Sequence, residues 1–114
     1  MGGTFNCSNN QLTSLEGAPQ EVGGSFNCYW NKLTSLKGAP QTVGEDFYCS
    51  GNKLNSLKGA PQIVNGCFDC SNNQLITLEG APQIIGYWFD CYNNPNLHSL
   101  DGIGEVKGLI YKAF

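Results

Sequence analysis

The sequence predicts a solenoid, in which similar turns of the chain stack on one another and each turn adds one short strand to a parallel β-sheet. The first observation behind this prediction is that three kinds of residue recur every 21 positions. They are Phe5, Phe26, Phe47, Phe68 and Phe89, then Cys7, Cys28, Cys49, Cys70 and Cys91, and then Asn10, Asn31, Asn52, Asn73 and Asn94. A fixed period in this range is typical of solenoids. One unit has too few apolar residues to enclose a core, so its neighbours must supply the other walls.

The second observation is the alternation of apolar and polar residues at the start of each unit. Phe26 and Cys28 alternate with Ser25, Asn27 and Tyr29, which is the pattern of a short strand that buries one face. A strand of about four residues leaves about 17 to return the chain, which is enough for a parallel crossover. We therefore expect a parallel sheet with one strand per repeat, a convex side of loops and turns, and little or no α-helix.

The rest of each unit is predicted to form loops and turns. Asn31 has an equivalent in every unit. Its amide can donate to backbone carbonyls and accept backbone N–H groups that a curving loop leaves unpaired, so we expect a buried asparagine ladder. Leu33 and Leu36 follow it and point inward. The run Gly38-Ala39-Pro40 forms a tight outer bend, because Gly tolerates positive φ and Pro presets a turn. Val43 then returns the chain to the core.

The order Phe-x-Cys-x-x-Asn-x-Leu-x-x-Leu resembles the leucine-rich repeat family, which has Leu-x-Leu-x-x-Asn-x-Leu-x-x-Leu at these positions. The resemblance covers practically the whole chain. It implies a curved solenoid with the sheet on its concave side and, as for most members, a role in binding proteins. The Gly-Ala-Pro-Gln bend and the Phe-x-Cys strand look particularly like repeats of small proteins of tailed phages and bacteria, and they are similar to short repeats of secreted bacterial effectors. One departure is that Val22 lies four residues before Phe26, where the family commonly has three.

Both ends of the chain depart from the repeat. A strand is already expected at Thr4–Cys7, so only Met1 to Gly3 remain to cover the first sheet edge; either that edge is exposed or a second chain pairs with it. Near the other end, one residue is gained around Pro95 and one is lost around Gly102–Glu105. Lys112 then occupies the position of the core cysteines, which indicates a terminal cap. We expect residues 1–114 to form a single domain of about five repeats and a capping strand.

Composition restricts the partners and the location. The formal charge of -3 comes from nine acidic residues and six lysines, with no arginine. Nucleic acid is therefore not expected as a partner, because phosphate binding draws on clustered cations. Residues 1–4 lack the basic start of a signal peptide, and no apolar run approaches the roughly 18 residues that a membrane span needs. We expect no membrane association and a cytoplasmic location.

The cysteines are expected to be reduced. Five of the six share one repeat position, where another repeat protein would carry Leu or Val, so they are interpreted as small buried hydrophobes. Stacked positions roughly 4.8 Å apart lie within disulfide reach, but their side chains would point in parallel into a filled core. We therefore expect free thiols and a protein that resides in a reducing compartment.

The residues that point outward from the strands carry the information on function, because the repeat does not dictate their identity. Both tryptophans, four of the five tyrosines and three of the nine acids lie at these positions. The predicted partner-binding residues are Tyr29, Trp30, Asp46, Tyr48, Asp69, Trp88, Asp90 and Tyr92. Aromatic anchors in a polar surround are typical of binding hot spots. We expect a concave face that binds another protein with a basic or mixed surface.

Other interpretations stay open. Outward aromatic residues also suit strands, and Trp30 would then pack beneath the loop as part of the core. A carbohydrate or small-ligand binder would use Trp88, Tyr92 and Tyr29 as stacking platforms, with Asp69 and Asp90 accepting hydroxyl groups. A structural assembly unit would pair through the N-terminal edge strand. The phage resemblance implies a small viral protein that binds or inhibits a bacterial host protein, such as a defence protein, in the host cytoplasm.

The sequence predicts no enzyme, no cofactor and no metal site. Asp69 and Asp90 should lie side by side on adjacent strands, and such a pair can hold a cation or share a proton. No third ligand or partner base accompanies them. Cys67 and Cys70 have the spacing of a dithiol site, but residues three apart in a strand face opposite sides, so Cys67 should be an accessible outward thiol. The single histidine, His98, is interpreted as a surface residue.

Overall fold

The computed structural model describes residues 3–113, and the regular secondary structure of this range consists of eleven strands of two residues each. The strands are β1 (Phe5–Asn6), β2 (Glu21–Val22), β3 (Phe26–Asn27), β4 (Thr42–Val43), β5 (Phe47–Tyr48), β6 (Ile63–Val64), β7 (Phe68–Asp69), β8 (Ile84–Ile85), β9 (Phe89–Asp90), β10 (Glu105–Val106) and β11 (Ile110–Tyr111). Met1, Gly2 and Phe114 lie outside the described residues. The prediction that concerns Met1 and Gly2 at the first sheet edge therefore also lies outside them. Within residues 3–113 no helix is long and apolar enough to cross a membrane.

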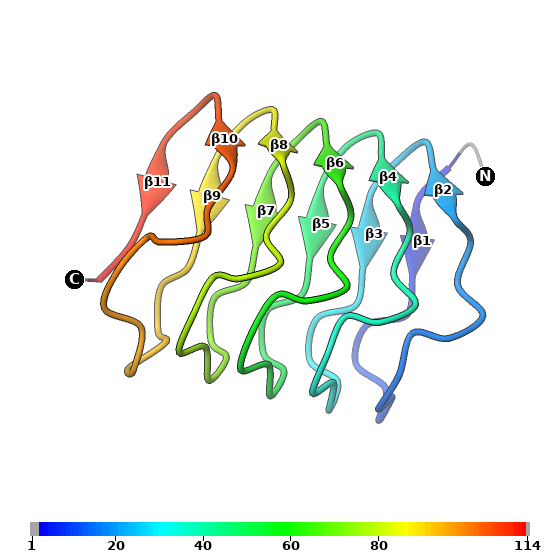
Figure 1. Ribbon diagram of the computed structural model, residues 1–114. Coiled ribbons are helices and arrows are strands. Elements are labelled where there is room, and N and C mark those ends of the chain that lie inside the picture. The colour runs from blue at the N-terminus through cyan, green and yellow to red at the C-terminus, as the bar shows by residue number, and fades with distance from the viewer. Residues whose placement is uncertain (1–2, 114) are drawn as a thin grey trace.

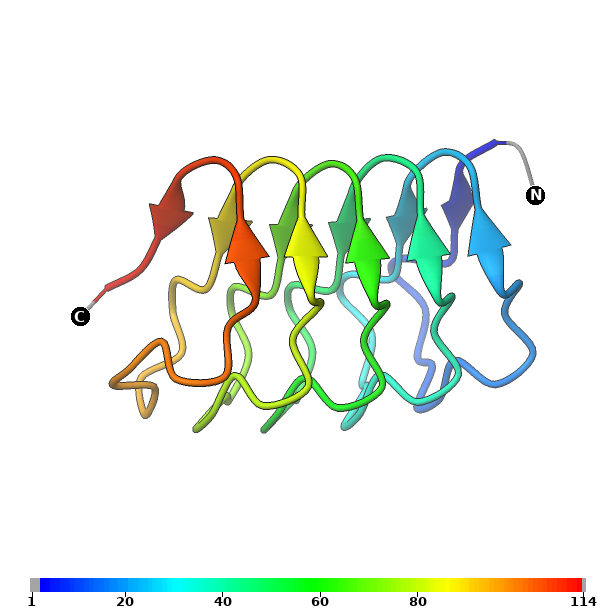
Figure 2. The same ribbon diagram turned by 45° about the horizontal axis from the view of Figure 1, so that its top comes forward.

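The strands form two parallel sheets that run along the stack of turns (Figure 1). The six-stranded sheet has the order β1-β3-β5-β7-β9-β11, and the five-stranded sheet has the order β10-β8-β6-β4-β2. Neighbouring strands pair in register with the sequence repeat, so that Phe26 lies between Phe5 and Phe47. Figure 2 shows the two rows of strands joined along one rim by short bends, with the longer loops on the opposite side. Residues 3–113 therefore form the predicted solenoid, and this range contains no helix.

The six-stranded sheet is the predicted one, with one strand in each turn. The five-stranded sheet is an addition to that prediction. Its strands begin at residues that follow no pattern, from Glu21 through Thr42 and Ile63. Once the turns are stacked in register, each extended segment lies beside its equivalent and the backbone groups pair, whatever the outward side chain is.

The core consists of columns of identical residues. The rings of Phe5, Phe26, Phe47, Phe68 and Phe89 stack with centroid distances of 5.2 to 5.8 Å and interplanar angles of 4 to 18°. Four cysteines of the repeat column are buried, Cys7 is half-buried, and all six cysteines are free thiols. Burial raises the pKa of each thiol in the column, so these side chains are neutral. The prediction that they act as small core hydrophobes is confirmed.

The predicted asparagine ladder is also confirmed. Asn52 donates from Nδ2 to the carbonyl oxygens of Cys28 at 3.1 Å and Cys49 at 3.0 Å, and its Oδ1 accepts the Leu33 N–H at 3.0 Å. Asn31, Asn73 and Asn94 make the equivalent bonds. Each asparagine thus pairs backbone groups of two turns that the loop would otherwise leave buried and unpaired.

The two ends of the described stack differ. Ile110 pairs in register with Phe89, as the realigned sequence predicts, and Lys112 is exposed. In the last loop the Leu97 N–H donates to the backbone oxygen of Asn94 at 3.0 Å, instead of to an asparagine side chain of a further turn. The residue gained around Pro95 thus lets this loop pair its own backbone, as a cap should. At the opposite end β1 and β2 are edge strands of the described sheets, and pairing of that edge with a second chain stays a prediction.

Candidate binding face

The outward side of the six-stranded sheet, called the sheet face below, carries the predicted partner-binding residues. Register pairs Tyr48 of β5 with Asp69 of β7, and Asp69 with Asp90 of β9. These three side chains are therefore neighbours on successive strands, about 4.8 Å apart along the stack. The sequence places them together correctly, because a fixed period makes equivalent positions adjacent.

A second column, at the position before each phenylalanine, is held by side-chain acceptors. Thr4 Oγ1 accepts the Ser25 N–H at 3.4 Å, Ser25 Oγ accepts the Asp46 N–H at 3.2 Å, and Asp46 Oδ1 accepts the Cys67 N–H at 2.8 Å. Each of these side chains thus satisfies a backbone donor of the next turn. The Asp46 carboxylate is fixed on the sheet face in this way.

Asp46 also connects the acidic and aromatic parts of the face. The Tyr48 hydroxyl donates to Asp46 Oδ2 at 3.0 Å. Partial burial of the phenol, followed by this hydrogen bond and the Asp46 charge, raises the pKa of Tyr48 to about 12. The Tyr29 ring meets the Tyr48 ring edge to face, with centroids 6.5 Å apart and an interplanar angle of 87°. An edge-to-face contact favours one relative orientation of the two rings, and its energy adds to that of burying their surface.

The remaining aromatic residues stand at the two sides of this group. Trp88 meets Tyr111 edge to face at 5.8 Å, and the Tyr92 side chain is 45% exposed. Trp30 is 55% exposed. The alternative that Trp30 packs beneath the loop as core is therefore wrong, because a core indole would be covered like the phenylalanines.

Asp69 and Asp90 use one oxygen each to order the backbone that follows. Asp69 Oδ1 accepts the Ser71 N–H at 3.0 Å and the Ser71 hydroxyl at 2.6 Å, and Asp90 Oδ1 accepts the Tyr92 N–H at 3.0 Å. Desolvation raises the pKa of Asp90, the hydrogen bond from Tyr92 opposes this, and the charge of Asp69 adds to the rise. The two carboxylates form a concentrated negative site that a cationic group would relieve.

The prediction of an accessible Cys67 thiol is wrong. The side chain points away from the phenylalanine column, but it is only 5% exposed. It lies in the column between Asp46 and Trp88, and its thiol interacts with the Asp46 side chain and the Trp88 backbone. Burial raises the pKa of this thiol, and the nearby Asp46 and Asp69 charges add to the rise. Cys67 is thus an inert residue of the face rather than a reactive one.

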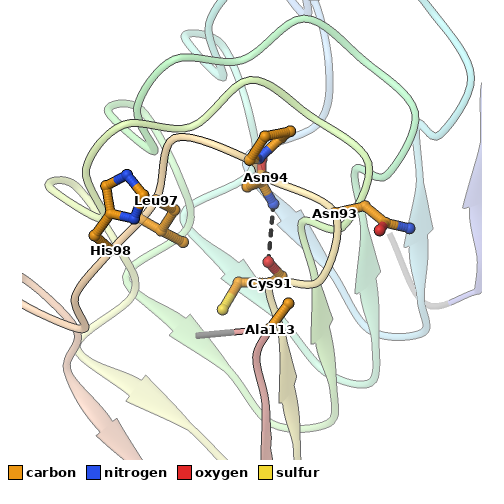
Figure 3. A pocket seen from close by; sticks show the side chains of 7 residues that line it. Cys91, Asn93, Asn94, Leu97, His98 and Ala113 are labelled. Carbon is orange, nitrogen blue, oxygen red and sulfur yellow. Dashed lines mark hydrogen bonds between the residues drawn. The ribbon is translucent and has the colours of Figure 1, made fainter.

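Two hollows lie at the ends of the described stack and not on the sheet face. One of about 340 Å³ is lined by Cys91, Asn93, Asn94, Pro95, Leu97, His98 and Ala113. Figure 3 shows the loop residues of this hollow on one side and Ala113 on the other, with Asn94 bonded to the Cys91 oxygen. The second, of about 200 Å³, is lined by core residues that include Phe5, Leu12 and Ala18. Sequence reasoning did not find these hollows, although the irregular residues around Pro95 were a signal for the first.

No group of three or more His, Cys, Asp or Glu side chains in residues 3–113 is arranged to hold a metal ion. Comparison of the chain with models of protein families, with curated proteins and with solved structures gave no match. The fold alone therefore defines the class of protein, which is a parallel β-solenoid of about five turns with 21 residues in each turn.

Proposed function

We propose that this solenoid is a non-enzymatic interaction module that binds a protein partner through the sheet face. The observation that carries the proposal is a contrast between the two sides of the same strands. Inward positions repeat the same residue in turn after turn, whereas the outward positions vary along the stack, apart from pairs such as Asp69 and Asp90, and gather tyrosine, tryptophan and aspartate. The fold has no need of that variety, and aromatic anchors beside charged groups are what protein recognition uses.

The charge on the face supports a partner with a basic or mixed surface. Asp46, Asp69 and Asp90 lie on three successive turns of the sheet face, within a chain whose formal charge is -3. Complementary charge on a partner would speed association and fix its register, while the neighbouring aromatic rings would supply most of the affinity.

A non-enzymatic role is supported by the side chains that nucleophilic or acid-base catalysis would need. The Cys67 thiol is covered and its pKa is raised, which leaves little thiolate at neutral pH. His98 lies on the last loop, on the hollow at the end of the stack, and not beside the carboxylates of the sheet face. The proposal therefore assigns no catalytic residue.

The test is a pull-down from bacterial lysate with three matched forms of the protein. One variant combines Tyr48→Asn, Asp69→Asn and Trp88→Ser, which are residues that other turns carry at the same positions. A control variant combines Gln41→Ala, Asn55→Ala and Ile76→Ala, which are exposed and lie outside the sheet face. A protein retained by the wild type and the control, and lost with the face variant, supports the proposal. Retention of the same protein by the face variant contradicts it.

The source and target of the module rest on the resemblance alone. Because the repeats look like those of leucine-rich repeat proteins of tailed phages, we propose that the partner is a bacterial host protein, with a defence protein as the first class to test. Identifying the retained protein by mass spectrometry separates this from a partner of another kind.

A second candidate function is self-assembly through the N-terminal end of the stack. It is favoured by β1, an edge strand of the described sheet, and by the adjacent hollow that leaves Phe5, Leu12 and Ala18 only partly covered. Edge strands readily pair with other chains. Light scattering decides this candidate, because a strict monomer at high protein concentration contradicts it.

A further inference from the structure

Besides the glycine of the outer bend, such as Gly38, one further backbone position in each turn has a positive φ and adopts a left-handed conformation. It lies two residues after the cysteine of the repeat column, and its φ is 57° at Asn9, 57° at Trp30, 71° at Gly51, 55° at Asn72 and 55° at Asn93. Asn and Gly are the residues that tolerate this region, whereas a bulky side chain there is a genuine outlier. Trp30 is thus the one member of this set that the local backbone disfavours.

The fold makes room for Trp30 by having glycine at the next position of the column. A Cβ atom on Gly51 would lie 2.5 Å from Cδ2 and from Cε3 of the indole and 3.0 Å from Cε2. These three atoms together place the Gly51 backbone against the flat face of the six-membered ring. Much of the indole still faces solvent, because the residue is 55% exposed.

Turns four and five show what the same position looks like without tryptophan. There Asn93 Nδ2 donates to Asn72 Oδ1 at 3.0 Å, so that the two amides bond from turn to turn. Trp30 and Gly51 cannot form this amide–amide bond. In addition, Trp30 has a left-handed backbone conformation that tryptophan disfavours. Burial of the covered part of the indole offsets part of this loss, whereas the exposed part contributes nothing to it.

The surroundings of Trp30 indicate what its exposed part would bind. Tyr29 precedes it in the chain and meets Tyr48, whose hydroxyl donates to Asp46. The face thus combines aromatic rings with a fixed negative charge. The face of an indole is the best aromatic acceptor for a cation, and a carboxylate within the same surface adds to that attraction.

We propose that Trp30 is the anchor of the sheet face and that it receives a lysine or arginine side chain of the protein partner on the exposed part of its indole. This inference rests on the proposed function and adds the contact residue and the chemistry of its ligand. Gly51 is the positioning residue, because any side chain there would push the indole off its seat.

The test uses Trp30→Asn and Gly51→Asn, alone and together, with a synthetic peptide of alternating Gly and Arg as the probe and an otherwise identical Gly and Gln peptide as the control. Binding is followed by NMR, and unfolding by urea. Trp30→Asn should weaken binding of the arginine peptide about fivefold, which is about 1 kcal/mol, and should raise stability towards urea. Gly51→Asn should lower both binding and stability in the wild type, and should be tolerated once Trp30 is Asn.

The outcomes separate the anchor from the rest of the face. If Trp30→Asn leaves binding unchanged while Asp69→Asn weakens it, the anchor is wrong and the proposed face stands. If neither variant changes binding of the arginine peptide, or if the wild type does not bind it more tightly than the glutamine peptide at millimolar concentration, the cationic ligand is wrong. Loss of stability in Trp30→Asn also overturns the proposal, because Trp30 would then be a packing residue.

Discussion

The inward and outward sides of the six-stranded sheet come from the same strands, yet they follow different rules. Inward, Phe26 repeats Phe5 and Asn52 repeats Asn31, and each residue completes the packing or hydrogen bonding of the turn beside it. Outward, neighbours such as Asn27 and Tyr48 differ in type and pair through the backbone, although one outward column also accepts backbone N–H groups of the next turn. Identical inward neighbours are therefore the main determinant of the fold, and the outward side is freer to vary, as the proposed role in recognition requires. The predictions below test how complete this division is.

The largest effect is expected on the inward side, at the asparagine ladder. Asn52→Ala would leave the Leu33 N–H buried without a partner, and it would remove one of the two asparagine bonds to each of the Cys28 and Cys49 carbonyls. The unpaired donor and the two lost bonds should lower the free energy of unfolding by about 2–4 kcal/mol. Urea denaturation of the wild type and the variant measures this change in the free energy of unfolding.

The matched control for this prediction is Asn55→Ala, three residues further along the same loop and exposed. It should change the free energy of unfolding by less than about 0.5 kcal/mol. If the two variants lower the free energy of unfolding by similar amounts, the asparagine of the ladder is no more important for stability than an exposed asparagine, and the prediction is wrong.

An effect of opposite sign is expected at an outward residue. Asn27 Oδ1 is buried and has no hydrogen-bond partner, whereas Asn6 Oδ1 at the equivalent position accepts the N–H and the hydroxyl of Ser8. Asn27→Val removes the unpaired acceptor and adds a residue that suits strands. The free energy of unfolding should rise by about 1 kcal/mol.

Asn6→Val is the control for that change, because there the substitution destroys two hydrogen bonds. It should destabilise the fold, so the two variants should shift the urea midpoint in opposite directions. If both variants destabilise the fold, Asn27 Oδ1 accepts a hydrogen bond in solution. The outward column would then be constrained by hydrogen bonding as the inward columns are.

The inward columns could be predicted from the sequence because each of their residues recurs at one spacing, and a stack converts equal spacing into contact. This is why the phenylalanine stack, the cysteine column and the asparagine ladder are all as expected. The five-stranded sheet escaped prediction because only the second residue of each of its strands recurs, as at Val22, Val43 and Val64, and one recurrent apolar residue does not show the alternation of a strand. Its pairing follows from the stacking of the turns and not from local propensity.

The outward side could be predicted only in part. Register correctly brings Asp69 and Asp90 together, but alternation wrongly predicted an exposed Cys67, because alternation gives the side of the sheet and not how far the neighbouring turns bury a small side chain. The left-handed position of Trp30 had a signal, since Asn9, Gly51, Asn72 and Asn93 occupy that position in the other turns. Asn and Gly recurring there indicate positive φ. Only the structure shows that Gly51 faces the indole.

The smallest effect is expected where two outward residues repel each other. Desolvation and the charge of Asp69 raise the pKa of Asp90. At neutral pH the charged Asp90 carboxylate therefore lowers the stability of the folded state relative to the unfolded chain. Asp90→Asn keeps an oxygen for the Tyr92 N–H and removes the charge. It should stabilise the fold at neutral pH by a few tenths of a kcal/mol, roughly the scale of exposed charge pairs.

The pH dependence gives this prediction its sign. A raised pKa in the folded state means that the folded protein takes up the proton first as pH falls, so the disadvantage of the wild type shrinks as pH drops through the folded pKa and vanishes below the ordinary carboxyl pKa. The difference in unfolding free energy between wild type and Asp90→Asn should therefore be present at neutral pH and close on acidification. A difference that grows on acidification would mean that a cation stabilises the Asp90 carboxylate in the folded state, and the outward side would then contribute to the fold as the inward side does.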